Sequence, residues 1–220
     1  MTPPATAAET RVIVFARAPE PGVAKTRLIP LLGAERAAAL QGILLERALA
    51  TAINANIGRV ELWCAPSAQH PLLAACAQRH GIDAVTQCDG DLGARMQHAA
   101  AATLAANARA IIIGTDCPAL TADELRAAAN ALDREHDAVL IPAEDGGYVL
   151  IGLNGWDARL FSGIAWGGDQ VANATRARFA AMHWRWHELP SSWDVDCPAD
   201  FTRLQASGLI HGLDRALRRH

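Results

Sequence analysis

The sequence predicts a Rossmann-like three-layer α/β/α fold built on a mostly parallel β-sheet. Short runs of valine, isoleucine and leucine alternate along the chain with longer segments of helical composition. Strands that are apolar throughout, rather than at every second residue, are typical of a parallel sheet covered by helices on both faces. Ligands of such sheets bind outside the carboxyl ends of the strands, so functional residues are expected in the loops that follow the strands.

The first half of the chain alternates regularly between strand and helix. A β-branched run predicts a strand over Arg11–Arg17, and a segment rich in Ala, Leu, Glu and Arg predicts a helix over Gly33–Ile53. The same patterns then predict a strand over Arg59–Ala65, a helix over about Pro71–Arg79, a short strand at Ala84–Val85, a helix over about Leu92–Ala106 and a strand over Arg109–Thr115.

The middle of the chain continues this alternation. Thr121 followed by Glu124 has the spacing of a capping box, which predicts a helix over about Ala122–Asp133. Two further apolar strands are expected over Asp137–Ala143 and Tyr148–Leu153.

Beyond Gly155 the pattern loosens and five of the six tryptophans occur. His183–Leu189 alternates like an edge strand, and Cys197–Gly208 predicts a terminal helix that ends at its glycine. The tryptophans are expected to shape an acceptor site or a homodimer contact, or equally to pack in the core. Without an internal repeat or a linker, residues 11–220 are expected to form a single domain after a disordered tail at residues 1–10.

Composition excludes several classes of protein. A hydrophobic fraction of 51% excludes a disordered chain, and a net charge of -3 argues against nucleic acid as a partner. The five cysteines contain no CxxC pair, so neither a disulfide framework nor a zinc site is suggested. The absence of a secretory pattern and of a long apolar stretch predicts a cytoplasmic protein without a membrane span.

The loop after the first strand, PEPGVAKTRL at 19–28, has the residues of a phosphate-binding loop. Gly22 permits close approach of the backbone to a ligand, while Lys25 and Arg27 supply cations and Thr26 a hydroxyl group. The spacing of Gly22 and Lys25 excludes a Walker A loop, and GxGxxG is absent. The alternative is an ordinary turn with two solvated cations.

Two acidic segments are candidates for a divalent metal site. Asp116 follows a buried strand in GTDCP, where a carboxylate can bind Mg²⁺ unless it merely caps a turn. In WDVDCPAD, Asp194 and Asp196 alternate and are expected to project to opposite faces, so that only one of them meets Asp116. We choose Asp196, because it precedes Cys-Pro as Asp116 does, and leave Asp194 a positioning or ion-pairing role.

Two glycine-containing loops are less specific. CDGDLGARM, at 88–96, allows a base or ribose to approach at Asp91 and Gly93, or is simply a capped turn. EDGGYVLIGL, at 144–153, places Asp145, Gly146 and Gly147 between two strands, either as a plain hairpin turn or as the wall of an acceptor pocket.

Taken in order, FARAPEPGVAKTRL, GDLGARM, GTDCPAL, DGGYVLIGL and WDVDCPAD closely resemble the bacterial DUF2064 proteins, from about Val12 to Leu204. These proteins are assigned to the superfamily of nucleotide-diphospho-sugar transferases with the glycosyltransferase A (GT-A) fold. That superfamily includes molybdenum-cofactor nucleotidyltransferases and phospholactate guanylyltransferase. The sequence departs from the family pattern at Gly167 and Gly168, where a small polar pair is usual, and at Cys197, where many members have threonine.

The resemblance implies a nucleotide bound across the first half of the sheet. The loop from Arg17 to Arg27 would hold phosphates, Asp91 to Arg95 would lie near the base or ribose, and Asp116 with Asp196 would bind Mg²⁺ or Mn²⁺. Catalytic roles are expected for Lys25, Arg27 and Asp116, and an acceptor site is expected at Asp145, Gly146, Gly147 and Trp166. Nucleotidyl transfer from an NTP to a small phosphorylated acceptor is the first hypothesis, glycosyl transfer the second, and nucleotide binding without turnover the third.

Overall fold

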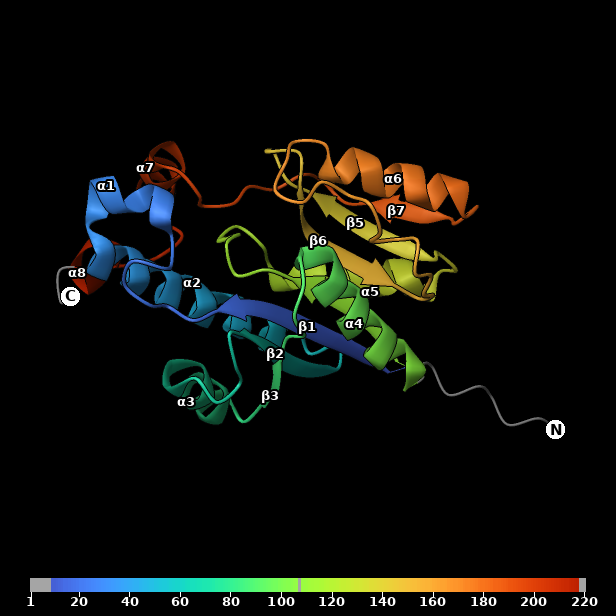
Figure 1. Ribbon diagram of the computed structural model, residues 1–220, viewed down its shortest axis with the longest axis horizontal. Helices are drawn as coiled ribbons and strands as arrows, with labels where there is room; N and C mark the ends of the chain where they lie inside the picture. The colour runs from blue at the N-terminus through green and yellow to red at the C-terminus, as the bar shows by residue number, and fades with distance from the viewer. Residues whose placement is uncertain (1–8, 107, 218–220) are drawn as a thin grey trace.

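The computed structural model describes residues 9–106 and 108–217, in which seven strands form one sheet (Figure 1). Their order is β3-β2-β1-β4-β6-β5-β7. β6 runs antiparallel to both of its neighbours, and the remaining pairs are parallel, which confirms the predicted mostly parallel sheet. The strands are β1 (Thr10–Arg17), β2 (Arg59–Ala65), β3 (Asp83–Thr86), β4 (Arg109–Ile113), β5 (Ala138–Pro142), β6 (Tyr148–Leu153) and β7 (Trp186–Glu188).

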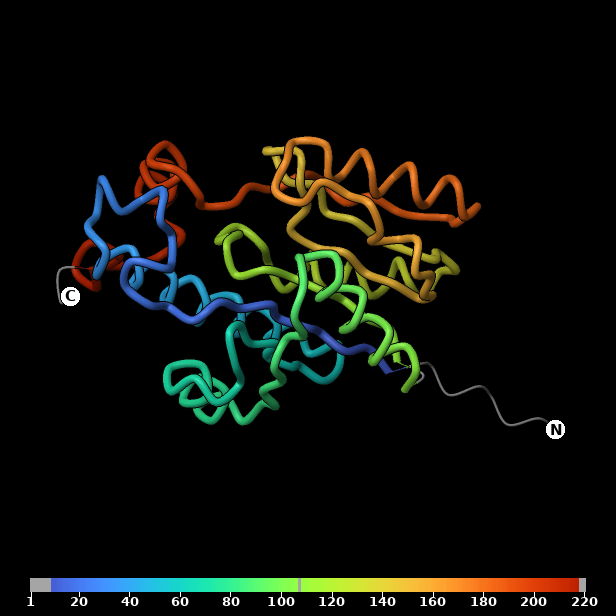
Figure 2. Tube along the Cα trace, in the orientation of Figure 1, coloured from blue at the N-terminus to red at the C-terminus, as the bar shows by residue number. Residues whose placement is uncertain are grey.

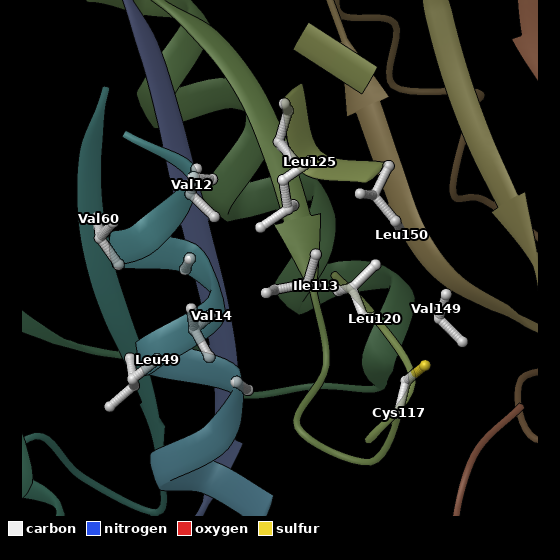
Figure 3. Close-up of a cluster of buried hydrophobic side chains, with 14 of the residues drawn as sticks. Val12, Val14, Leu49, Val60, Ile113, Cys117, Leu120, Leu125, Val149 and Leu150 are labelled. Carbon is white, nitrogen blue, oxygen red and sulfur yellow. The ribbon is translucent and has the colours of Figure 1, made fainter. Parts of the chain in front are cut away.

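Helices cover both faces of the sheet and complete the predicted three layers. Val12 and Val14 of β1 belong to the core shared with α2 (Ala34–Ala55), α3 (Pro71–His80) and α5 (Ala122–Asp133). Figure 3 shows Val12 and Val14 on the same side of the sheet as Leu49 of α2. Ile13 belongs instead to the opposite core, with α4 (Leu92–Ala105) and α6 (Val171–Ala181). The fold is therefore the α/β arrangement that the apolar strands predict.

A third apolar cluster joins two segments that are far apart in the chain, beside the sheet. It packs α7 (Pro198–Ser207) and α8 (Leu213–Leu217) against the N-terminal half of α2, beside the 3-10 helix η1 (Thr26–Leu28) and α1 (Ile29–Leu32). The tube view shows these segments, far apart in sequence, at one end of the molecule (Figure 2). Leu28 and Val195 are both fully buried in this cluster. The predicted phosphate loop is thereby held next to the segment that carries Asp194 and Asp196.

The structure differs from the sequence prediction at a few elements. β1 begins at Thr10, inside the predicted tail, and residues 1–8 of that tail lie outside the described residues. α6 was not predicted, because only four of its eleven residues are buried and its apolar stripe is weak. The capping box of Thr121 and Glu124 is present, and α7 is followed by Gly208 in a left-handed conformation, as predicted. The expectation of one domain over residues 11–220 stays a prediction.

The aromatic residues of the last third mostly pack within the molecule. The rings of Trp184 and Trp186 lie 5.9 Å and 5.7 Å from that of Phe179, which is fully buried. The guanidinium group of Arg203 lies 4.3 Å from the centre of the Trp193 ring. Core packing therefore accounts for these tryptophans, while a homodimer stays a prediction. Among the described residues, no helix combines the length and apolar character that crossing a membrane requires.

Candidate active site

A cavity of about 600 Å³ opens where β1, β2 and β4 end. Arg17 and Ala65, the last residues of β1 and β2, lie on its wall, as does Gly114 directly after β4. Seven of the predicted site residues also line it: Arg17, Lys25, Thr26, Arg27, Arg95, Asp116 and Asp196. The fold thus gathers basic and acidic side chains at the edge of the sheet where ligands of this fold bind.

Lys25 lies at the centre of this constellation. Its Nζ atom is 2.7 Å from Oδ1 of Asp116 and 3.4 Å from Oδ1 of Asp196, and it donates a 2.6 Å hydrogen bond to the carbonyl oxygen of Val195. Only 3% of the side chain is exposed. The backbone of Lys25 is left-handed, with φ 50° and ψ 45°, a conformation that costs a non-glycine residue about 1 kcal/mol or more. The strained turn directs the lysine inward, onto the two carboxylates expected to bind metal.

A relay of hydrogen bonds orients Asp116. Nε2 of Gln41, on α2, donates to Oγ1 of Thr115 at 2.9 Å, and this hydroxyl donates to Oδ1 of Asp116 at 3.3 Å. Gln41 and Thr115 are both about 5% exposed. Sequence reasoning missed both residues, although a glutamine on the buried face of an alanine- and leucine-rich helix was a usable signal. The relay holds one rotamer of Asp116 toward Lys25.

Asp194 also faces the acidic cluster. Burial raises the pKa of Asp194 to about 7, and the negative charges of Asp116 and Asp145 add to this effect. The choice of Asp196 rather than Asp194 as the residue that shares a metal with Asp116 stays a prediction. Residues 193–196 form no regular strand, so strict alternation between two faces does not apply to them.

The carboxylates fit a hard divalent cation. Asp116 and Asp196 have exposed fractions of 41% and 50%, so a hydrated ion can reach them. The Lys25 ammonium group already contacts both, which shows that a single cation can span the pair. Carboxylate oxygens are the ligands that Mg²⁺ and Mn²⁺ prefer. The adjacent thiol of Cys117 is instead buried and lies 3.2 Å from the Ser192 hydroxyl.

The other residues predicted to bind the nucleotide differ in their exposure and in their hydrogen bonds. Arg27 is 74% exposed and lies 3.6 Å from Oδ2 of Asp196, so it is free to reorient toward a ligand. Asp91 caps α4 by accepting a 2.8 Å hydrogen bond from the Ala94 amide, in agreement with the alternative of a capped turn. Nε of Arg95 donates to the carbonyl oxygen of Gly90 at 3.1 Å. Gly22 has a positive φ of 81° within the loop, outside the cavity wall.

The predicted acceptor residues are not among those that line the cavity. Oδ1 of Asp145 accepts a 2.9 Å hydrogen bond from the Gly147 amide, in the turn between β5 and β6. Gly146 has a φ of 91°, and a Cβ atom there would overlap the carbonyl group of Asp169. The segment is therefore a hairpin turn, and its function as an acceptor wall stays a prediction.

Trp166 connects two of the predicted subsites. A Cβ atom added to Gly93 would lie 2.7 Å from Cε2 of Trp166, closer than side-chain atoms approach one another. The indole ring thus packs directly on the backbone of the first turn of α4, and this contact explains the glycine. The acceptor function of Trp166 and the nucleotide-binding function of Gly93 stay predictions.

Comparison with known proteins gives a family match and several structural matches. The family described as uncharacterized proteins conserved in bacteria (DUF2064) matches residues 48–168. A search of curated proteins finds no match. A structure from Desulfovibrio desulfuricans, provisionally described as a nucleotide-diphospho-sugar transferase, is similar with a TM-score of 0.85 and 26% identity, over 97% of this chain and 98% of that chain.

Two more distant structures share the fold. A cytidylyltransferase from Leptospira borgpetersenii is 12% identical, with a TM-score of 0.60, over 92% of this chain and 87% of that chain. The Mycobacterium tuberculosis protein Rv0371C, crystallised as a complex with manganese, is 19% identical, with a TM-score of 0.53, over 91% of this chain and 100% of that chain. These likenesses show the expected nucleotide-diphospho-sugar transferase type of fold.

Proposed function

The chain belongs to the DUF2064 family of proteins conserved in bacteria, and we propose that it transfers a nucleotidyl group from an NTP to a small phosphorylated acceptor. The observation that carries this proposal is the placement of Lys25 against Asp116 and Asp196, in a cavity lined by three arginines. A triphosphate brings more negative charge than a diphosphate-sugar, and four cations around one cavity suit that larger charge.

The reaction needs positioning and charge neutralisation rather than a protein nucleophile. An oxygen atom of the acceptor phosphate forms a bond to the α-phosphorus of the NTP while the bond from that phosphorus to the bridging oxygen breaks, and pyrophosphate leaves. Lys25 and Arg27 would contact the phosphate oxygens on which negative charge develops. Arg17 and Arg95, which also line the cavity, would fix the nucleotide in line with the acceptor.

Asp116 and Asp196 would hold Mg²⁺ or Mn²⁺, which supplies neutralisation of the phosphate charge when bound. The relay from Gln41 through Thr115 would keep Asp116 oriented toward the ion. The manganese complex of Rv0371C, a protein of the same fold, is consistent with this choice of ion.

Glycosyl transfer from a nucleotide-sugar is the second candidate. The provisional description of the Desulfovibrio desulfuricans structure as a nucleotide-diphospho-sugar transferase favours it. The same cavity and metal ligands serve this reaction, but the diphosphate then stays on the leaving group. The released product therefore separates the two reactions, because nucleotidyl transfer yields pyrophosphate and glycosyl transfer yields a free NDP.

The first experiment is thermal unfolding of the purified protein with each NTP and with UDP-, GDP- and ADP-sugars, with and without Mg²⁺. A ligand at 100 times its Kd stabilises the folded state by about 2.7 kcal/mol, or roughly 5 to 10 °C at this chain length. A metal-dependent rise with one NTP, followed by pyrophosphate release with phosphorylated acceptors, supports the proposal. A rise with nucleotide-sugars alone points to glycosyl transfer, and binding without any product favours a nucleotide-binding protein without turnover.

Three further expectations belong to this proposal. The acceptor would bind beside Asp145, Gly146, Gly147 and Trp166, the protein would work in the cytoplasm, and it would form a homodimer. Asp145→Ala is expected to raise the KM for the acceptor with little change in the KM for the nucleotide. Equal changes in both KM values would contradict the placement of the acceptor at this turn.

A further inference from the structure

Three side chains able to bind a transition metal meet between α2 and α3, away from the nucleotide cavity. Nε2 of His80 lies 2.7 Å from Oε2 of Glu46, and Sγ of Cys76 lies 3.3 Å from Oε1 of the same carboxylate. One ligand atom from each residue lies within 4.8 Å of the other two. None of the three lines the cavity that holds Lys25. The cluster is therefore separate from the proposed active site.

The helices preorganise this cluster. Cys76 and His80 are four residues apart on α3, so both side chains lie on the same face of that helix, opposite Glu46 on α2. Cys76 is 1% exposed, whereas the side chain of Glu46 is 40% exposed. The site therefore has a buried sulfur ligand and an open side.

The open side faces a second cavity of about 590 Å³, which Glu46, Cys76 and Arg79 help to line. This cavity gives an ion a route to the thiol and gives water room to act as a further ligand. Pro19 and Pro21 of the predicted phosphate loop also line this cavity.

We propose that Glu46, Cys76 and His80 bind Zn²⁺, with water as the fourth ligand of a tetrahedral site. One thiolate, one imidazole and one carboxylate form a ligand set that zinc binds well and magnesium does not. Binding releases the thiol proton of Cys76 to solvent, after which the two negative ligands balance the charge of the ion. The lack of a CxxC pair in the sequence concealed this site, because one ligand comes from another helix.

Arg79 is the competitor that the ion must displace. Its guanidinium group pairs with Oε1 of Glu46, but 59% of its side chain is exposed. An exposed ion pair contributes little to stability, so Arg79 can turn into solvent when the carboxylate binds metal. The bound ion would then tie α3 to α2 behind the segment of Pro19 and Pro21, with a structural rather than a catalytic role.

Cobalt titration of the full chain tests the proposal, because Co²⁺ takes the place of Zn²⁺ and gives an intense near-ultraviolet band when a thiolate binds it. The titration uses the Asp116→Asn/Asp196→Asn variant, which lacks the carboxylates of the proposed active site. This variant is the parent protein into which the further substitutions are introduced. We expect one equivalent of Co²⁺ to produce the band, and one equivalent of Zn²⁺ to remove it. The band should disappear in Cys76→Ser. In His80→Gln, which keeps the thiolate, the affinity for Co²⁺ should fall at least tenfold. Cys88 is a half-buried cysteine elsewhere, so Cys88→Ser should retain both the band and the affinity.

Thermal unfolding with chelator and with added Zn²⁺ controls for misfolding of the variants. We expect zinc to raise the unfolding midpoint of the parent protein by several degrees and to leave that of His80→Gln unchanged. The absence of a thiolate band in the parent protein, or its persistence in Cys76→Ser, would overturn the proposal and leave Glu46 as the centre of an ion-pair network. Neither result depends on nucleotide binding, so failure here is distinct from failure of the proposed function.

Discussion

The ammonium nitrogen of Lys25 lies 2.7 Å from Oδ1 of Asp116, in the space where a metal bound by Asp116 and Asp196 is expected. With 3% of its side chain exposed, Lys25 is a buried counter-ion of the pair rather than a free phosphate ligand. If the proposed metal binds there, metal and lysine would compete for the same carboxylates until a phosphate group drew the lysine away. We therefore expect nucleotide binding and metal binding to be coupled through Lys25.

Replacing Lys25 with Met should have opposite effects on the two ligands. The affinity for Mn²⁺ without nucleotide should rise about tenfold, because the carboxylates lose their internal cation, whereas NTP affinity should fall about tenfold or more. Isothermal titration of each ligand measures both quantities.

Arg27→Met is the matched control for Lys25→Met. Arg27 lies 3.6 Å from Asp196 but is 74% exposed, so solvent screens its charge. This variant should weaken NTP binding and change the Mn²⁺ affinity less than twofold. Equal gains in Mn²⁺ affinity in both variants would mean that net charge alone is responsible, and would exclude direct competition by Lys25.

The stability of the metal-free protein should depend on Asp194. Its pKa in the folded state is raised from 3.8 to about 7, so the folded chain binds this proton more tightly than the unfolded chain does. The resulting stabilisation is complete below about pH 4 and is lost as the pH rises to about 7. Asp194→Asn should therefore unfold several degrees above the parent protein at pH 8, a gain on the order of a few kcal/mol, with no gain at pH 4.

Melting curves in the presence of chelator at the two pH values check this difference. Asp196→Asn is the control, because the Asp196 side chain is 50% exposed and pairs with Lys25. It should give no comparable gain at pH 8. A gain for Asp194→Asn that is equal at both pH values would show that ionisation is not its cause.

The sequence predicted Asp116 and the cationic loop because each follows an apolar strand, and the carboxyl ends of parallel strands meet at one edge. Asp196 was chosen on a weaker signal, the Cys-Pro pair that follows it as one follows Asp116. It did not predict the contact between Lys25 and Asp116, which depends on a left-handed backbone at a lysine. Gln41 was missed because its partner Thr115 is 74 residues away in the chain. Helix α6 was missed because its contact with the sheet needs few apolar residues.

The hydroxyl of Thr115 should be needed to position Asp116. Thr115→Val keeps the shape of the side chain but removes the hydrogen bond to Asp116 and leaves Gln41 without an acceptor. Loss of such a partner of a metal ligand typically costs 10- to 100-fold in metal affinity or activity. We expect a fall of about tenfold in Mn²⁺ affinity, measured by titration, and recovery in Thr115→Ser. Equal losses in both variants would indicate a packing role for the methyl group instead.

Gly93 should be required for the seating of Trp166. Gly93→Ala places a methyl group about where the indole ring packs, and such overpacking typically destabilises a protein by about 1 to 3 kcal/mol. Gly168→Ala is the matched control, because its added Cβ would lie no closer than 3.5 Å to any neighbour, here the Ala165 carbonyl oxygen. Thermal unfolding should show a clear loss of stability for Gly93→Ala and a change within about 0.5 kcal/mol for Gly168→Ala.

In the double variant Gly93→Ala/Trp166→Ala the methyl group has no ring to displace, so the destabilisation of this variant should be smaller than the sum of the two single losses. Additive losses would mean that the strain at Gly93 comes from the backbone and not from Trp166.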